Sequence, residues 1–241
     1  MISYCSTARE IKGTAAEIAV LPIGSTEQHG PHLPIGTDYM IAGAIGAAVS
    51  EQTGALLLPA LPISTCREHK GGMGSVWMNS DTFYQMLKDI AESLRVQGFK
   101  RLILLIAHGG VFVAGPAVRE INSDSQDIKL IRVDLVNFIG CEEMQQVLDF
   151  HNNLHACEYE TSLMLYLHEP LVKKEMIEDC VPDVPRDYLN YGTFLQFSKN
   201  GVWGKPSLAT KEKGERIFHL LVKKSVEYIQ KVNHILEGAL V

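Results

Sequence analysis

Several features that mark large classes of proteins are missing or scarce in this sequence of 241 residues. Its five cysteines are odd in number, form no C-x-x-C motif and match no zinc-finger spacing. We therefore expect reduced thiols in a cytoplasmic protein, because disulfides persist mainly in oxidising compartments. Residues 1–14 lack the charged start and the long apolar run of a signal peptide.

Positive charge and long hydrophobic runs are also scarce. Lys and Arg number 22 against 28 Asp and Glu, which gives a formal net charge of −6 and no basic stripe to meet phosphates. The uncharged run over residues 39–50 is rich in Gly and Ala and is too short to cross a bilayer. These absences argue against nucleic acid and membrane as partners.

What the sequence does contain is the pattern of a globular α/β protein. Hydrophobic residues make up 46% of the chain, which is ordinary for folded proteins. At this length, one large domain is as probable as two small ones. Apolar runs predict strands at 17–24, 55–61, 101–108 and 128–135, and helical patterns lie at about 38–53, 80–97, 113–122, 155–167 and 211–236. Because strands alternate with helices, we predict a mostly parallel sheet covered on both faces.

The stretch over residues 180–210 follows no regular pattern and contains several prolines. A segment of about 30 residues without a predicted element is unusual inside a compact domain and is often functional. We expect this stretch to roof a pocket or to join a subunit interface.

Polar side chains follow the first and third predicted strands. Glu27, His29 and Asp38 come after the first strand, and His108 ends the third. Open α/β sheets place ligands beyond the carboxyl ends of their strands, so these four residues are expected at one edge of the sheet. Carboxylate and imidazole donors together suit zinc, manganese or iron. The sequence therefore predicts a metal site.

The spacing of these donors favours two ions. Residues two apart in an extended segment project to the same side, so Glu27 and His29 can face one cavity. Asp38 at a helix start can offer both carboxylate oxygens and bridge two cations. Two cations about 3.5–4 Å apart share a hydroxide and polarise a carbonyl in two-metal hydrolysis.

A second motif, HACEYETS over residues 155–162, lies at a predicted helix start. His155 and Glu158 are three residues apart and would share a helix face. One interpretation is an acid-rich first turn that the helix dipole favours. The other makes Glu158 a further ligand and His155 a proton shuttle, because imidazole titrates near neutral pH.

The run over residues 21–38, LPIGSTEQHGPHLPIGTD, closely resembles the signature of the creatininase (creatinine amidohydrolase) family. The resemblance continues in order through Glu68-His69, Gly74-Ser75, His108-Gly109-Gly110, residues 155–162 and residues 209–214. It implies one domain over residues 1–241, a three-layer α/β/α sandwich and a homohexamer. It also implies two divalent metal ions per subunit, zinc or manganese or both, with iron possible, and hydrolysis of cyclic or linear amides.

Carried over by position, Glu27 and His108 would hold one metal and His29 the other, with Asp38 bridging. His155 matches the catalytic histidine of the family, which would pass a proton to the leaving nitrogen after hydroxide attack on the carbonyl. The candidate substrate-binding residues are Glu68, His69, Ser75 and Gly109.

The chain also departs from creatininase itself. Creatininase has Tyr-Glu directly after the histidine that matches His108, and that Glu is a metal ligand; here the two positions are Gly109 and Gly110. We predict that Glu158 supplies the missing carboxylate, either as a ligand or as a general base. A Trp-Asp pair that precedes the catalytic histidine in creatininase is His151-Asn152 here. Creatinine as the substrate therefore does not follow.

Other reactions and one non-enzymatic function stay open. The predicted function is hydrolysis of a C–N bond in a small-molecule amide, such as a creatinine-like lactam or a formamide. Relatives in the family are also thought to open cyclic diketones in sugar or inositol catabolism, or to trim modified peptides. A nucleotide- or phosphate-binding module is a weaker alternative, because the turn from His108 to Gly115 contains neither G-x-G-x-x-G nor G-x-x-x-x-G-K-[ST].

Overall fold

The computed structural model describes residues 1–238 and contains one parallel sheet of four strands. The strands are β1 (Ile18–Ile23), β2 (Leu56–Leu57), β3 (Arg101–Ile106) and β4 (Lys129–Asp134). Their order across the sheet is β2-β1-β3-β4, and every neighbouring pair is parallel. The predicted α/β class is confirmed.

The central strands are apolar on both sides because both faces of the sheet are covered. Alternate residues of β3 enter two separate hydrophobic clusters: Ile103 and Leu105 enter one, and Leu102 and Leu104 enter the other. All four side chains are fully buried. Burying a side chain of this size stabilises a fold by about 1.5–3 kcal/mol, so β3 contributes to both layers of the core.

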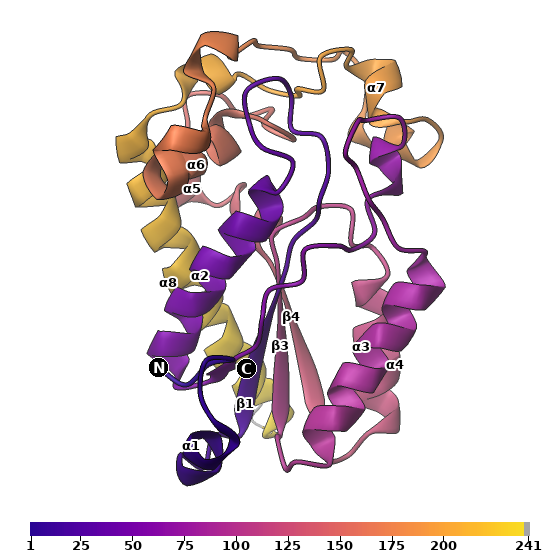
Figure 1. Ribbon diagram of the computed structural model, residues 1–241, viewed down its shortest axis with the longest axis vertical. Coiled ribbons are helices and arrows are strands. Elements are labelled where there is room, and N and C mark those ends of the chain that lie inside the picture. The colour runs from indigo at the N-terminus through magenta and orange to yellow at the C-terminus, as the bar shows by residue number, and fades with distance from the viewer. Residues whose placement is uncertain (239–241) are drawn as a thin grey trace.

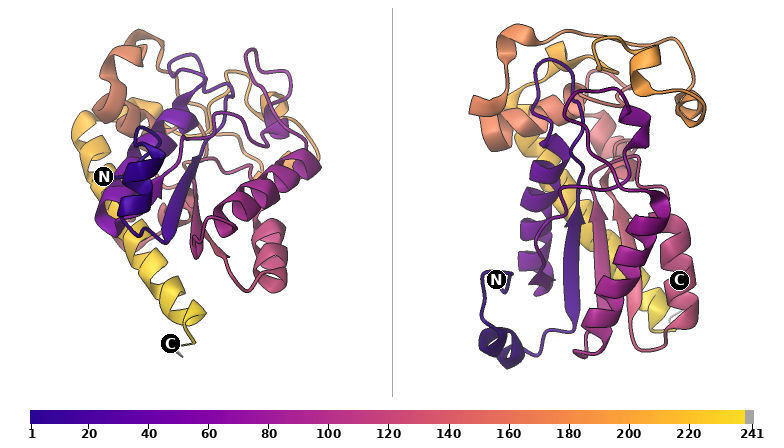
Figure 2. Two further views of the ribbon diagram at one scale, coloured as in Figure 1. Left: turned by 60° about the horizontal axis from the view of Figure 1, so that its bottom comes forward. Right: turned by 45° about the vertical axis from the view of Figure 1, so that its right-hand side comes forward.

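Five longer helices form the outer layers (Figure 1). One face of the sheet is covered by α2 (Thr37–Thr53), α6 (Glu158–His168) and α8 (Lys211–Leu236). The other face is covered by α3 (Ser80–Arg95) and α4 (Ala114–Asp124). The turned views in Figure 2 show the same two layers on either side of the strands, which is an α/β/α sandwich.

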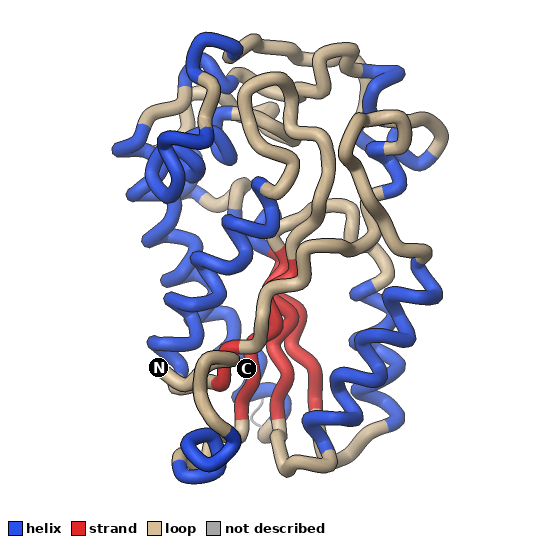
Figure 3. Tube along the Cα trace, in the orientation of Figure 1, coloured by secondary structure: helices blue, strands red, loops and turns tan. Residues whose placement is uncertain are grey.

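Most of the short elements and loops gather beyond the carboxyl ends of the strands, whereas the first helix lies at the opposite end, beside the start of β1 (Figure 3). The short α-helices of the chain are α1 (Ala8–Gly13), α5 (Glu142–Gln145) and α7 (Phe194–Phe197). The 3-10 helices are η1 (Arg67–His69), η2 (Leu135–Phe138), η3 (Glu169–Leu171), η4 (Lys174–Met176), η5 (Arg186–Asn190) and η6 (Pro206–Leu208). Within the described residues, no helix is both long and apolar enough to span a membrane.

Two element boundaries differ from the sequence-based prediction for local reasons. The predicted strand over 55–61 shortens to two residues, because Pro59 has no N–H to donate to a ladder. The helix predicted from residue 155 begins at Glu158 instead. Ala156 has a positive φ of 47°, which breaks the helical path just before that point. His155 therefore lies in a loop and not on the helix face.

The irregular stretch over residues 180–210 passes over the carboxyl ends of the strands in Figure 1, where it carries η5 and α7. Its residues 186–187, 189–194 and 196 line a cavity, as described below. The prediction that this stretch roofs a pocket is confirmed.

Candidate metal centre

Four buried side chains meet at the carboxyl ends of β1 and β3. Glu27 and His29 lie in the loop after β1, Asp38 lies in the first turn of α2, and His108 follows β3. Their exposed fractions are 0%, 0%, 2% and 6%. Gly24 allows this approach, because a Cβ there would lie 2.4 Å from the backbone nitrogen of Tyr39 in α2. The end of β1 and the start of α2 therefore pack closely enough to bring Asp38 into the centre.

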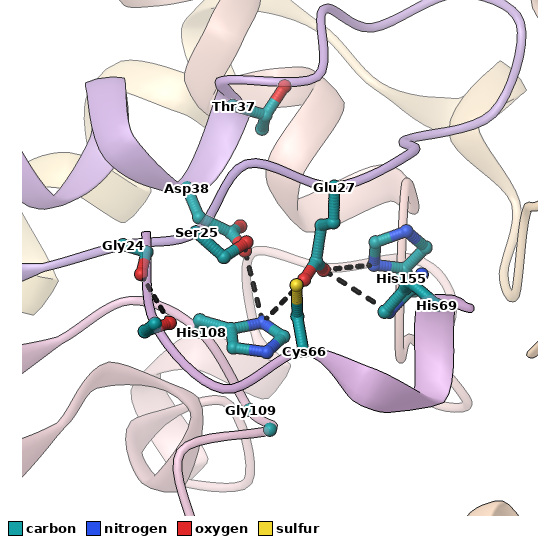
Figure 4. A network of polar contacts seen from close by, with 12 residues as sticks. Gly24, Ser25, Glu27, Thr37, Asp38, Cys66, His69, His108, Gly109 and His155 are labelled. Carbon is teal, nitrogen blue, oxygen red and sulfur yellow. Dashed lines mark hydrogen bonds and ion pairs between the residues drawn. The ribbon is translucent and has the colours of Figure 1, made fainter. Parts of the chain in front are cut away.

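The first group of donors joins Glu27, Asp38 and His108 (Figure 4). His108 Nδ1 lies 3.3 Å from Glu27 Oε2 and 3.1 Å from Asp38 Oδ2. The other ring nitrogen of His108, Nε2, donates to the carbonyl of Thr65 at 3.0 Å. That bond fixes the ring, so Nδ1 faces the two carboxylates.

The second group joins His29, Asp38 and Glu160. His29 Nε2 lies 3.2 Å from Asp38 Oδ1 and 3.9 Å from Glu160 Oε1. His29 Nδ1 donates to the backbone carbonyl of Glu27 at 3.1 Å, which leaves Nε2 to face the carboxylates. Asp38 thus presents one oxygen to each group, and Ser25 holds it by donating to Oδ2 at 2.9 Å. This is the arrangement expected of a bridging carboxylate.

The structure corrects the expectation for Glu158. Its carboxylate is fully buried but accepts the backbone N–H groups of Asp149 at 3.0 Å and Phe150 at 2.9 Å, and it pairs with the Lys213 ammonium. Glu160 occupies the place in the centre that was expected for Glu158. Residues two apart in a helix point about 200° away from each other, so only one of the two can face the centre. The prediction chose Glu158 from its position in the motif, and the geometry favours Glu160 in its place.

His155 forms a third group of possible metal donors with Glu27 and His29, in an orientation set by the backbone. Its Nε2 donates to the carbonyl of Gln28 at 2.7 Å, and its Nδ1 lies 3.6 Å from Glu27 Oε1. Its ring centroid is 4.2 Å from that of His29 and 4.4 Å from that of His69. Burial and these neighbouring rings hold the pKa of His155 well below its usual 6.5. The imidazole is therefore neutral, with the lone pair of Nδ1 facing the centre.

The predicted substrate-binding residues divide into two sets. Glu68, His69 and Gly109 line the cavity over the centre. His69 Nε2 lies 3.2 Å from Glu27 Oε1, and Glu68 Oε1 lies 3.4 Å from His108 Nε2. Ser75 is outside the cavity lining; its hydroxyl accepts the N–H of Gln28 at 3.0 Å. The structure thus corrects the expectation for Ser75, which supports the loop that carries Glu27 and His29.

A cavity of about 1130 Å³ opens over the donors. Its floor includes Glu27, Asp38, His108, His155 and Glu160, and its roof is the stretch predicted to cover a pocket. Phe194 of that roof packs on the rings of His69 and His155, with centroids 4.9 and 4.8 Å away. Sequence analysis missed Glu160, Phe194 and the roof arginine Arg186. Only Glu160 had a local signal, since it lies inside the second motif.

Glu27 provides a test of whether cations fit this centre. Both of its carboxylate oxygens are buried and lack a hydrogen-bond donor, although His69 and His108 nitrogens lie 3.2 and 3.3 Å away. An unpaired buried carboxylate is costly, so a stable fold needs a positive charge there. Although burial opposes it, the carboxylates of Asp38, Glu160 and Glu27 raise the pKa of His29 to about 10. The donor set is therefore short of positive charge, which divalent cations would supply.

Comparison with known proteins gives consistent matches over nearly the whole chain. The sequence model of the creatininase family, described as creatinine amidohydrolase, matches residues 5–229. A mycofactocin precursor peptide peptidase of Mycobacterium ulcerans (strain Agy99) is 28% identical, with 94% of this chain and 89% of that protein covered. A creatinine amidohydrolase of Pseudomonas putida is 27% identical, with 89% of each covered.

A solved structure named Creatininase Mn has the same fold. It superposes with a TM-score of 0.82 at 25% sequence identity and covers 95% of this chain and 98% of its own. The predicted resemblance and the α/β/α architecture are both confirmed by these matches.

Proposed function

This chain belongs to the creatininase family, and we propose that it uses two divalent metal ions to hydrolyse a C–N bond of a cyclic or linear amide. Membership makes it a hydrolase of carbon–nitrogen bonds. The observation that carries the two-metal proposal is the position of Asp38, whose two oxygens belong to two different groups of donors. A single ion would leave one of these groups without a bound cation, so that only its own imidazole would offset the buried carboxylates.

We assign Glu27 and His108 to one ion, His29 and Glu160 to the other, and Asp38 to both. The chemistry of the donors, imidazole nitrogen with carboxylate oxygen, suits zinc and manganese and is compatible with iron. Manganese is also the metal named for the solved creatininase structure. When bound, such ions supply Lewis acidity and lower the pKa of water.

His155 is the proton carrier in this proposal. Its neutral Nδ1 faces the centre and can accept a proton from the attacking water, then return it to the nitrogen of the broken amide. The carbonyl of Gln28 fixes the tautomer through Nε2–H, and the ring of Phe194 covers the imidazole. This role requires neither Glu158 nor Cys157, both of which are buried away from the cavity lining.

A second candidate function is cleavage of an amide bond in a peptide. The relative from Mycobacterium ulcerans is named as a precursor peptide peptidase. The cavity of about 1130 Å³ exceeds the roughly 300–1,000 Å³ that is usual for small-molecule sites. The same donors and the same histidine would serve this reaction.

Metal analysis and a hydrolysis screen test the proposal together. Protein purified with zinc or manganese should hold two ions per chain by elemental analysis. Lactams, formamides, short peptides and cyclic ketones are then offered, with Asp38→Asn as the matched control. Turnover of an amide by the wild type alone supports the proposal. No stoichiometric metal would contradict it, and turnover of ketones only would change the bond to carbon–carbon.

We also propose that the chain assembles as a homo-oligomer, a hexamer by its family. Exposed apolar side chains support an interface in the loops near the centre: Met73 is 92% exposed, and Ile35 and Val76 are also exposed. Light scattering on the purified protein measures the mass of the assembly, and a monomer at micromolar concentration would contradict the proposal.

A further inference from the structure

Three cationic side chains line the cavity at its outer part. They are Arg67 and Lys70, which lie in and just after η1, and Arg186, which begins η5 in the roof. All three are exposed. Within residues 1–238, none of the three forms an ion pair, and the acidic residues next to them in the lining are Asp187 and Glu68. The mouth of the cavity is therefore positively charged although the chain as a whole carries a net charge of −6.

Of these three cations, Arg186 is the one that contacts a residue beside the proposed metal centre. Its Nη2 lies 3.5 Å from the carbonyl oxygen of Gly109, the residue after His108. A Cβ at Gly109 would lie 3.0 Å from the same nitrogen, so the glycine leaves room for the guanidinium. A single long hydrogen bond to a carbonyl leaves most of the five N–H donors of an arginine free. Arg186 thus has free N–H donors beside Gly109, the residue that follows the proposed ligand His108.

The charged groups deeper in the cavity do not neutralise the positive charge of these three side chains. On the proposed function, two divalent ions face the carboxylates of Glu27, Asp38 and Glu160, so the loaded centre keeps one positive charge. Glu68 is the remaining carboxylate of the inner lining, and its carboxylate is directed to His108 Nε2. The loaded centre is then close to neutral. A cleft whose entrance has one sign of charge concentrates ligands of the opposite sign.

We propose that the substrate of this centre is an anionic amide, whose carboxylate or phosphate is bound by Arg186 in a cavity that Arg67 and Lys70 also line. The inference rests on the proposed function and specifies its substrate class. Arg186 is then a specificity-determining residue: a planar guanidinium binds a carboxylate or phosphate through two parallel hydrogen bonds. The size of the cavity fits this class, because such a substrate must extend from the metal centre to the mouth.

Matched pairs of probes test the inference on the zinc-loaded protein. One pair is N-formylglucosamine 6-phosphate and N-formylglucosamine; the other is a formylated tripeptide with a free C-terminal carboxylate and its C-terminal amide. We expect the charged member of at least one pair to have a kcat/KM about tenfold higher, as a hydrogen bond to a charged group implies. The pair with the larger preference identifies the anion as phosphate or carboxylate.

Variants assign that preference to a residue. Arg186→Gln should remove the preference for the anion, and Arg186→Lys should retain part of it. Arg119→Gln, the same change at an exposed arginine of α4 outside the cavity lining, should leave the preference unchanged. Equal kcat/KM for both members, or a preference that survives in Arg186→Gln, would overturn the inference while hydrolysis itself still stands.

Failure of the proposed hydrolysis can be distinguished from failure of the inference by measuring binding. If no probe is hydrolysed, calorimetry measures the affinity of the same four probes for the zinc-loaded wild type and for Arg186→Gln. If the wild type binds the anionic member more tightly and Arg186→Gln does not, the anion site is supported although the proposed reaction is not. Equal affinity of the charged and neutral members would overturn the inference.

Discussion

The centre and its roof are built in opposite ways. Glu27 and His108 are buried and follow core strands, and Asp38 is buried in the first turn of α2. The roof over residues 180–210 has only short helices, and Tyr191 there is 85% exposed. Groups that must hold ions are thus fixed by the sheet and by α2. Groups proposed to meet the substrate, such as Arg186, lie at exposed positions of an irregular segment, although Val202 and Trp203 of the same segment are buried.

This difference predicts that substitutions in the centre remove the reaction, whereas substitutions in the roof change its selectivity. Five experiments can break or sharpen that comparison, and they follow from the largest expected effect to the smallest.

Asp38→Asn should have the largest effect, because it weakens both ions while keeping the shape of the side chain. We expect activity to fall by more than about 100-fold, since groups that merely support metal ligands already contribute about 10–100-fold. Elemental analysis should show loss of metal, and circular dichroism should show an intact fold. Full metal content with full turnover would remove Asp38 from the centre.

His155→Ala should lower kcat by about 10²–10⁴-fold, the usual contribution of a positioned acid or base. Metal content should stay at the wild-type level, because in this proposal the two groups around Asp38 hold both ions, and His155 belongs only to the third group, with Glu27 and His29. Elemental analysis of the variant separates the two roles. Loss of an ion would make His155 a ligand.

Glu160→Gln and Glu158→Gln form a matched pair two residues apart. Glu160→Gln should reduce the content of one metal ion, because its carboxylate faces His29. Glu158→Gln should keep both ions but destabilise the fold by about 1.5–3 kcal/mol, because it removes the buried carboxylate that accepts from Lys213, Asp149 and Phe150. Elemental analysis and urea unfolding measure the two effects. The reverse pattern would restore the sequence-based choice of Glu158.

Chelation of metal from the wild type should lower its stability. A ligand present at about 100 times its Kd contributes about 2.7 kcal/mol, which is lost when the ligand is removed. Glu27→Gln should be less sensitive to chelation than the wild type, because the substitution weakens one of the two proposed ions. Without metal it should be more stable than the wild type, because it removes a buried carboxylate whose oxygens lack a hydrogen-bond donor. Thermal unfolding with and without EDTA checks both statements. A metal-free wild type as stable as the loaded protein would argue against resident ions.

Tyr191→Ala in the roof should have the smallest effect. Because the side chain is 85% exposed, its removal should change the free energy of unfolding by less than about 0.5 kcal/mol. Tyr191 lines the cavity, so KM should change a few-fold while kcat and metal content stay constant. Steady-state kinetics on any substrate found in the screen provide the measurement. A large loss of kcat would mean that the roof takes part in catalysis.

The sequence was sufficient for the sheet and for the four donors after its strands. Buried strands such as β3 are recognisable from continuous apolar residues, and the chain direction places their carboxyl ends together. The residues that follow them could therefore be grouped without a structure. The structure brings Glu27, His29, Asp38 and His108 together as expected.

What the sequence could not provide depends on single backbone angles and on long-range contacts. The choice between Glu158 and Glu160 depends on where α6 begins, and the positive φ at Ala156 has no reliable sequence signature. The position of Arg186 over Gly109 joins residues 77 apart through an irregular segment that has no periodicity. Tertiary packing decides such placements.

Anomalous diffraction from crystals grown with zinc tests the central claim most directly. The account predicts two peaks on either side of Asp38, one beside Glu27 and His108 and the other beside His29 and Glu160. A single peak, or none, with the oxygens of Asp38 bound only by protein groups, would contradict it.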